Sequence, residues 1–254
     1  MIAIMRKILL YFSLKYQGDY KKIYQAIKQK EKVAPKDLID IEQKILSQYV
    51  TLIDPNYPEL LKNIYNPPWV LYYYGDLSLL NHSHLIALIG TRNPSLYGKE
   101  MCESLVKELK STPCCLISGL AKGIDGLVHH YALMHQIKTI AVLGSGIDYC
   151  YPKKNQDLYQ RIKQEGLLIS EYPNKKIPLP IDFLLRNRLI AACCHHLVVI
   201  EASFHSGTMN TVTYALEYGK DVGCVPTMAN QKSGCNYLIK QGAKLIEEAK
   251  DILE

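Results

Sequence analysis

From residue 84 onward, short apolar runs alternate with segments of helical periodicity, and this alternation constrains the fold more than any other feature of the chain. Strand–helix–strand units of this kind form a mostly parallel α/β sheet with right-handed crossovers and helices on both faces. The carboxyl ends of the strands then meet at one edge, where α/β proteins bind ligands. We predict strands at 85–89, 114–117, 139–143, 167–169, 197–200 and 222–225, and helices near 96–110, 125–135, 154–165, 182–193, 208–218 and 235–241.

Residues 1–48 lie outside this alternation. They are rich in Lys, Gln, Ile and Leu, and spacings such as Ile23 to Ile27 predict a small helical N-terminal domain. We interpret this domain as a packing or spacer element, with direct contact to a polyanion as the alternative. Prolines and turns follow, with a short strand at 70–74, and we assign residues 49–254 to the main domain.

The loops after the predicted strands have the composition of anion-binding loops. In the first, Gly90-Thr91-Arg92, glycine allows the backbone to approach an anion and arginine supplies a planar fork of donors. Three later loops also combine glycine with serine or threonine. They contribute Ser118, Gly119, Lys122, Gly123, Gly144, Ser145, Gly146, Ser206, Gly207 and Thr208. One such loop is ordinary, but four at one edge of a sheet predict a site for phosphate groups.

Charge and composition narrow the classes of function. Residues 1–50 carry ten Lys/Arg against five Asp/Glu, whereas residues 51–254 carry twenty against nineteen, so the main domain has no large basic excess. A nucleic acid on that domain would be held by a few cations and by backbone N–H groups. No apolar run reaches the roughly 18 residues of a membrane span, and no signal-peptide cleavage site follows the first apolar run. We therefore expect a cytoplasmic protein without a membrane segment.

Sequence motifs for common cofactors and metals are absent. The loop at 144–146 follows a strand, but Tyr149 stands where a dinucleotide-binding loop has its third glycine. The phosphate loop of nucleoside triphosphatases does not occur. The histidine pairs at 129–130 and 195–196 lack metal-ligand spacing, and the eight cysteines form no Cys-x-x-Cys pair. We predict no cofactor, no metal and no catalytic residue.

Taken together, the ordered motifs resemble the DNA-processing protein A family (DprA, also called Smf) from Tyr49 to about Ala249. The matching segments are 118–125, 141–146, 151–152, 170–173, 186–191, 206–208, 225–226, 233–236, 238–239 and 242–243. The resemblance implies an extended Rossmann-like fold and a homodimer that binds single-stranded DNA without sequence preference. It also implies that the protein protects incoming DNA and loads the recombinase RecA during natural transformation.

The chain departs from the family pattern at three places. Leu184 replaces a proline that often follows the phenylalanine matching Phe183, and Thr227 stands where glycine often follows Val-Pro. The chain also stops at Glu254, so we do not expect the winged-helix domain found at the C-terminus of many relatives.

Residues of the segment 183–188 complete the predicted DNA site. Arg92, Lys122, Arg186 and Arg188 would supply cations, Asn187 belongs to the same matching segment, and Phe183 would offer a face on which a base stacks. Each has a structural alternative. Phe183 could pack in the core, and Arg186 or Arg188 could form an ion pair with Glu171 or Asp125.

Two other functions use the same kind of pocket. Nucleotide phosphoribohydrolases similar to the lysine-decarboxylase-like family carry a glutamate in a glycine-rich loop, but Thr211 stands at the matching position and cannot act as a carboxylate base. A small-nucleotide sensor that uses the same pocket is the third hypothesis. We prefer the DNA-binding function, without enzymatic activity.

Overall fold

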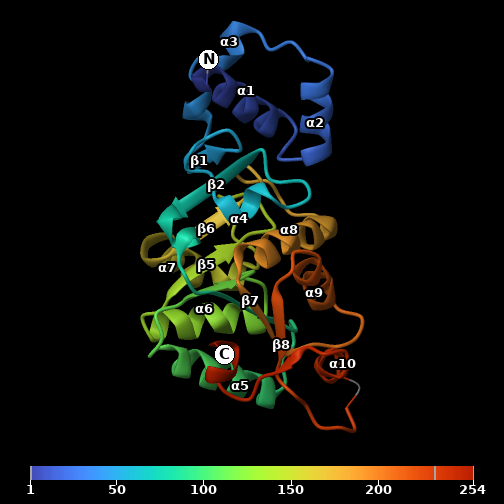
Figure 1. The fold of residues 1–254 in the computed structure, drawn as a ribbon. Helices are drawn as coiled ribbons and strands as arrows, with labels where there is room; N and C mark the ends of the chain where they lie inside the picture. Colours follow the sequence, from blue (N-terminus) through green and yellow to red (C-terminus); the bar gives the residue numbers. More distant parts are fainter. Residues whose placement is uncertain (1, 232, 254) are drawn as a thin grey trace.

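The apolar runs form strands because aliphatic and β-branched side chains fill both faces of a sheet covered by helices. A computed structural model describes residues 2–231 and 233–253, and within them it contains a nine-stranded sheet (Figure 1). The strands predicted from the alternating region are all present, which confirms the α/β fold prediction. The strands are β1 (Gln48–Thr51), β2 (Val70–Gly75), β3 (Leu85–Gly90), β4 (Cys115–Ser118), β5 (Lys138–Val142), β6 (Leu167–Ser170), β7 (His196–Glu201), β8 (Asp221–Cys224) and β9 (Lys244–Leu245).

The strand order places a topological switch point inside the sheet. The order is β1-β2-β6-β5-β4-β3-β7-β8-β9, with β2 antiparallel to both of its neighbours and the ladders from β6 through β9 parallel. From β3 the chain first builds outward through β4, β5 and β6, and it then returns to place β7 on the other side of β3. The crevice at the carboxyl ends of β3 and β7 is therefore the expected place for a ligand.

Helices cover both faces of this sheet (Figure 1). Their bounds are α1 (Ile2–Lys15), α2 (Tyr20–Lys28), α3 (Pro35–Leu38), α4 (Glu59–Lys62), α5 (Leu96–Leu109), α6 (Ile124–Met134), α7 (Gln156–Glu165), α8 (Pro180–Cys193), α9 (Gly207–Glu217), α10 (Gly234–Lys240) and α11 (Lys250–Leu253), with 3-10 turns η1 (Ile41–Lys44), η2 (Leu77–Asn81) and η3 (Lys153–Asn155). One core cluster joins α8, α9 and α10 to the sheet, for example through Leu189 and Val212. Another joins α5 and α6 to it, for example through Leu105 and Val128.

The first helices share a core with the sheet. Leu9 and Leu10 of α1 belong to the same buried cluster as Val70 and Tyr72 of β2. The Tyr72 hydroxyl donates a hydrogen bond to Ser13 Oγ at 2.8 Å, and both groups are buried. The helical prediction for this region is confirmed, and these helices pack directly on the antiparallel edge of the sheet. Within the part of the chain that the structure describes, no helix combines the length and apolar content needed to cross a bilayer.

Differences from the sequence prediction lie mainly at element ends. The helix expected from residue 154 begins as α-helix at Gln156, because the turn η3 follows Pro152. The strands β1 and β9 were not predicted, because β1 (QYVT) contains no aliphatic run and β9 has only two residues.

Candidate functional site

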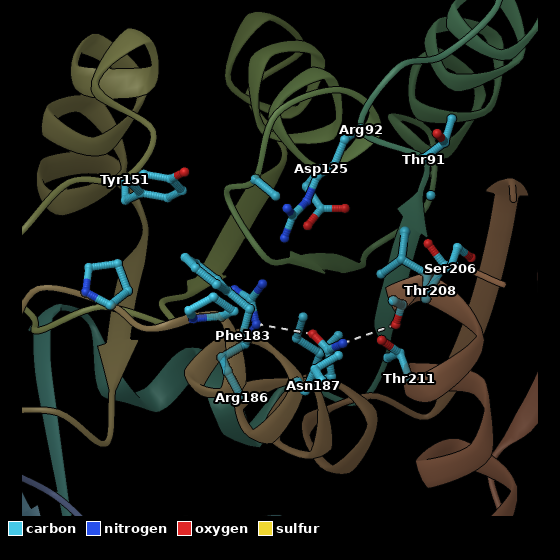
Figure 2. A pocket seen from close by; sticks show the side chains of 18 residues that line it. Thr91, Arg92, Asp125, Tyr151, Phe183, Arg186, Asn187, Ser206, Thr208 and Thr211 are labelled. Atoms are coloured by element: carbon cyan, nitrogen blue, oxygen red, sulfur yellow. Dashed lines mark hydrogen bonds between the residues drawn. The ribbon is translucent and has the colours of Figure 1, made fainter. Parts of the chain in front are cut away.

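A pocket of about 560 Å³ opens at the switch point, beside the carboxyl ends of β3 and β7 (Figure 2). Its walls come from the loops after β3, β4, β5 and β7, from the segment before α8, and from α6, α8 and α9. Nine of the residues predicted from the sequence line it: Gly90, Thr91, Arg92, Phe183, Arg186, Asn187, Ser206, Gly207 and Thr208. The remaining lining residues are Ile89, Ala121, Asp125, Tyr151, Pro178, Pro180, Leu184, Ile190 and Thr211.

The loop that carries Arg92 is held by Glu201 at the end of β7. The Thr91 N–H donates to the Glu201 backbone oxygen at 2.7 Å, and the Glu201 carboxylate accepts from the backbone and hydroxyl of Ser95. Ser95 in turn begins α5 by capping the N–H of Gly98. These hydrogen bonds use Thr91 and Ser95 and leave out the Arg92 side chain, which is exposed. Among the described residues no salt bridge holds it.

Phe183 and Tyr151 form an aromatic wall of the pocket. Their ring centroids are 5.3 Å apart, and the Arg92 guanidinium lies 5.5 Å from the Phe183 centroid. Phe183 is partly exposed and Tyr151 is exposed, so neither ring is buried in the core. A Cβ on Gly144 would come within 2.6 Å of the Phe183 ring, so Gly144 supports the wall from behind. The arrangement places a cation and two aromatic faces at one rim.

The N-terminus of α9 forms the opposite wall. Ser206 is its N-cap residue, but its hydroxyl donates to the Ser203 carbonyl at 2.9 Å and makes no capping bond to the helix. Gly207 is exposed, and a Cβ built on it would meet no atom within 4 Å. The first N–H groups of an α-helix have no partner inside the helix and favour anions. This wall therefore suits a phosphate group.

Arg186 lies beneath the pocket and uses its donors inside the protein. Its Nη1 donates to the carbonyls of Gly119, at 2.7 Å, and Val142, and its Nε donates to Asn187 Oδ1 at 3.3 Å. Burial lowers the pKa of Arg186 to about 10, against the opposing effect of the nearby Asp125 carboxylate. Burial also raises the pKa of Asp125. Arg186 contributes positive charge to the pocket floor, while its fork is committed to the loops.

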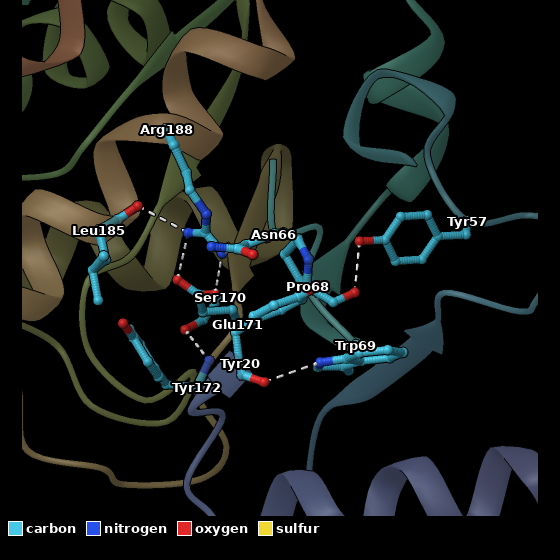
Figure 3. A network of polar contacts seen from close by, with 10 residues as sticks. All are labelled: Tyr20, Tyr57, Asn66, Pro68, Trp69, Ser170, Glu171, Tyr172, Leu185 and Arg188. Atoms are coloured by element: carbon cyan, nitrogen blue, oxygen red, sulfur yellow. Dashed lines mark hydrogen bonds and ion pairs between the residues drawn. The ribbon is translucent and has the colours of Figure 1, made fainter. Parts of the chain in front are cut away.

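Arg188 lies in a buried ion pair away from the pocket (Figure 3). Its Nη1 and Nη2 contact the Glu171 carboxylate at 2.8 and 2.6 Å, and they also donate to the carbonyls of Leu185 and Asn66. Burial lowers the pKa of Arg188, but the Glu171 carboxylate outweighs this effect, so the pKa is raised. The structure thus places Arg188 in the ion pair that the sequence left open as its alternative role.

Five predicted loop residues lie below the pocket surface and are buried: Ser118, Gly119, Gly144, Ser145 and Gly146. The hydroxyls of Ser118 and Ser145 donate to the carbonyls of Leu88 and Tyr149 at 2.7 and 2.6 Å. The Gly146 N–H donates to the Lys176 carbonyl at 2.9 Å. These hydrogen bonds within the protein shape the loops, so Ser118, Ser145 and Gly146 use these donors internally.

Lys122 and Gly123 line a second cavity, of about 580 Å³, that shares Arg92 with the pocket. We call it the basic cavity, because its other charged or ionisable lining residues are Lys99, Lys154 and His130. No carboxylate lines it in the part of the chain that the structure describes. Lys122 donates to Asn93 Oδ1 at 2.9 Å. Gly123 has φ +87° and packs against the backbone of Thr91 and Arg92, which a Cβ would prevent.

Some lining residues were not singled out from the sequence as site residues. Tyr151 was noted only as part of a Tyr-Pro motif, and Pro178, Pro180 and Leu184 belong to an apolar segment before and within α8. The sequence shows an apolar segment with several prolines there, but it does not indicate that this segment faces the pocket.

His195 and the cysteines take structural positions. His195 Nδ1 accepts from the Leu85 N–H at 3.1 Å, and all eight cysteines are free and buried. Over residues 2–231 and 233–253, no group of three or more His, Cys, Asp or Glu residues could hold a metal ion.

Comparison with known proteins places the chain in a family. Residues 48–254 match the family described as DNA recombination-mediator protein A. The chain belongs to this family. It is 39% identical over 205 residues to DNA processing protein DprA of Streptococcus pneumoniae, covering 80% of this chain and 72% of that protein. It is 37% identical over 207 residues to DprA of Bacillus subtilis, covering 81% and 70%.

Solved structures of family members share the architecture. The X-ray structure of DprA from Streptococcus pneumoniae superposes with a TM-score of 0.79 at 32% identity, covering 98% of this chain and 92% of that one. A Helicobacter pylori structure that addresses the single-stranded DNA binding mode of DNA processing protein A has a TM-score of 0.73 at 33% identity, covering 81% and 94%. The Rossmann-like fold expected from the sequence is therefore confirmed.

Proposed function

We propose that the pocket at the switch point binds single-stranded DNA without sequence preference, in the service of recombination of incoming DNA. The observation that carries the proposal is the exposed Arg92 guanidinium over the Phe183 ring, in the same pocket as the N-terminus of α9. Among the described residues, no salt bridge holds this guanidinium. Membership of the DNA recombination-mediator protein A family supports it.

The chemistry of the walls fits a nucleotide of a flexible strand. A phosphate fits between Arg92 and the first N–H groups of α9, since both offer donors and positive charge. The Phe183 and Tyr151 rings offer faces on which a base stacks, and stacking tolerates every base because each has a π face. A duplex would keep its bases paired and stacked on one another, and these rings would then have no partner. The proposal is therefore a preference for single strands.

The basic cavity beside the pocket gives the neighbouring phosphates a path. Lys99, Lys122 and Lys154 surround it, and Arg92 separates it from the pocket. With these side chains, the nearly neutral charge of residues 51–254 is compatible with DNA binding, because the cations gather at one place.

The deciding experiment is a fluorescence-anisotropy titration with a labelled oligothymidine, its duplex and free mononucleotides as competitors. We expect tight binding of the single strand and much weaker binding of the duplex, with weak competition by mononucleotides. Equal affinity for single strand and duplex, or a mononucleotide that binds as tightly as the oligonucleotide, would contradict the proposal.

We also propose that the pocket is not an enzyme active site. Thr211, at the position of the hydrolase glutamate, is buried against the pocket. The lining carboxylate is Asp125, whose pKa is raised by burial and which faces Arg186. Release of base or sugar from nucleoside monophosphates, scaling with protein concentration and lost in Thr208→Ala, would favour the phosphoribohydrolase alternative. Calorimetric binding of a free nucleotide without turnover would favour the sensor alternative.

The remaining parts of the proposal concern partners and location. We propose a cytoplasmic homodimer that loads RecA onto the strand it holds. Exposed apolar residues beside the edge strand β9, namely Leu216, Leu245 and Leu253, offer a surface for the second copy. Light scattering should give a dimer for the natural chain and a monomer for Leu245→Glu. RecA assembly on DNA coated with single-strand binding protein should be faster with this protein than without it.

A further inference from the structure

Four aromatic residues gather on the side of the molecule where α2 meets the loop before β2. Tyr20 stacks on Trp69 with ring centroids 5.5 Å apart and on Tyr24 at 6.4 Å. Tyr65, in the loop before β2, is 80% exposed and Tyr24 is 44% exposed. Tyr65 precedes Trp69 by four residues in the same loop, so this loop carries Tyr65 on the side of the molecule where Trp69 stacks on Tyr20.

The loop that presents Tyr65 is held in place from several sides (Figure 3). Asn66 has φ +58°, and its carbonyl accepts from Arg188 Nη2 at 3.0 Å. The Tyr57 hydroxyl donates to the Pro68 carbonyl at 2.8 Å, and Trp69 Nε1 donates to the Tyr20 carbonyl at 3.3 Å. A large aromatic side chain that is fixed at its backbone and almost fully exposed adds little to the core. Such a residue indicates a contact with another molecule.

Arg188 connects this aromatic surface to the pocket. Its guanidinium bonds both to the Leu185 carbonyl on α8 and to Asn66, next to Tyr65. Leu184, one residue earlier on α8, lines the pocket and is 41% exposed. The buried Arg188 side chain thus joins the exposed Leu184–Leu185 segment of α8 to the loop that carries Tyr65.

Charge along α2 complements a phosphate backbone. Lys21, Tyr24 and Lys28 follow the i, i+3, i+7 spacing, so they share one face of the helix, and all three are exposed. Within the described residues no salt bridge neutralises Lys21 or Lys28, whereas Lys22 pairs with Asp19. Stacking faces alternating with unpaired cations are what a nonspecific single-strand surface requires.

We propose that Tyr65, Tyr24, Lys21 and Lys28 form a second contact for single-stranded DNA, occupied by nucleotides that leave the pocket across α8. This inference rests on the proposed function of the pocket. It assigns the first helices a part in binding, beyond their packing on the sheet.

The test compares a short and a long oligothymidine, of about 4 and about 20 nucleotides, because single-strand sites on one domain span roughly 4 to 16 nucleotides. Tyr65→Ser should weaken binding of the long strand about five- to tenfold, the effect of losing one stacked base, and leave the short strand unchanged. Tyr65→Phe keeps the ring and should restore binding. Lys21→Gln with Lys28→Gln should weaken binding of the long strand only. Lys107→Gln with Lys110→Gln, at the C-terminal end of α5, is the matched control and should change the binding of neither strand.

The single tryptophan gives a direct readout, since Trp69 stacks within the same cluster. The long strand should quench its fluorescence in the natural chain and less so in Tyr65→Ser, while the short strand should not. Equal binding of the long strand to Tyr65→Ser and the natural chain, with no quenching, would overturn this inference and leave the pocket intact. If Arg92→Ala binds neither oligonucleotide while Tyr65→Ser binds both as the natural chain does, DNA binding is likewise confined to the pocket. If neither strand binds the natural chain, the proposed function fails and the second contact fails with it.

Discussion

Replacing Arg92 by alanine tests the pocket most directly. The side chain is exposed and takes part in no salt bridge among the described residues, so its removal should leave the fold unchanged. What is lost is a charge-assisted bond to phosphate, about 1.5 to 3 kcal/mol, or about 10- to 150-fold in Kd.

Anisotropy with labelled oligothymidine at several salt concentrations measures this loss. The slope of log affinity against log salt should fall by about 0.7, the effect of one phosphate contact on a single strand. Arg92→Lys keeps the charge but not the planar fork, and its affinity should lie between those of the natural chain and Arg92→Ala. Arg161→Ala is the control, because Arg161 pairs with Glu165 on the exposed face of α7. If Arg92→Ala binds within twofold of the natural chain, with the same circular dichroism and urea midpoint, Arg92 does not hold the strand.

Three further predictions concern the support of the site. Gly119→Ala should destabilise the fold by about 1 to 3 kcal/mol, because the new Cβ would lie 2.5 Å from the Asp125 carboxylate oxygen. Gly207→Ala should not, because no atom lies within 4 Å of its Cβ position, and urea unfolding of the two variants measures the difference. Glu171→Gln should lower the free energy of unfolding by about 3 kcal/mol, because it leaves the buried Arg188 guanidinium without its counter-charge. Glu165→Gln, in an exposed ion pair, should lower it by less than about 1 kcal/mol, and equal losses would contradict this prediction. Burial lowers the pKa of His129 to about 3. Below pH 6.5 the unfolded chain therefore binds a proton at this histidine that the folded chain does not bind. The free energy of unfolding should be highest above pH 6.5 and about 2 kcal/mol lower at pH 5. His129→Gln should remove most of that pH dependence, as urea midpoints at pH 5 and 7 would reveal.

The fold was predictable because each βαβ unit repeats the same two periodicities. The loop composition also indicated the edge of the sheet at which the pocket lies, since parallel strands bring their carboxyl ends together. The orientation of each polar group was harder to predict. Arg186 and Arg188 are two residues apart on α8, so they point in different directions, one beneath the pocket and the other toward Glu171. Their sequence gives no sign of which carbonyls and carboxylates they meet.

The glycine loops illustrate the same limit. A glycine followed by serine has the same composition whether its amides face a ligand or a neighbouring carbonyl. Gly146 donates to Lys176, while Gly207 stands open at the pocket. That difference depends on which segments pass nearby in space, which a local pattern does not contain. The part played by Tyr151 was missed for the same reason.

The shared core of α1 and β2 has a consequence for how the molecule responds to heat and to DNA length. Leu9, Leu10 and Tyr72 form one buried cluster, so loss of α1 would expose the antiparallel edge of the sheet, and both should unfold in a single transition. The same packing holds α2 at a fixed separation from the pocket, without a flexible linker. Affinity should therefore rise in a step at one oligonucleotide length, the shortest that spans both contacts, and not increase gradually with each added nucleotide.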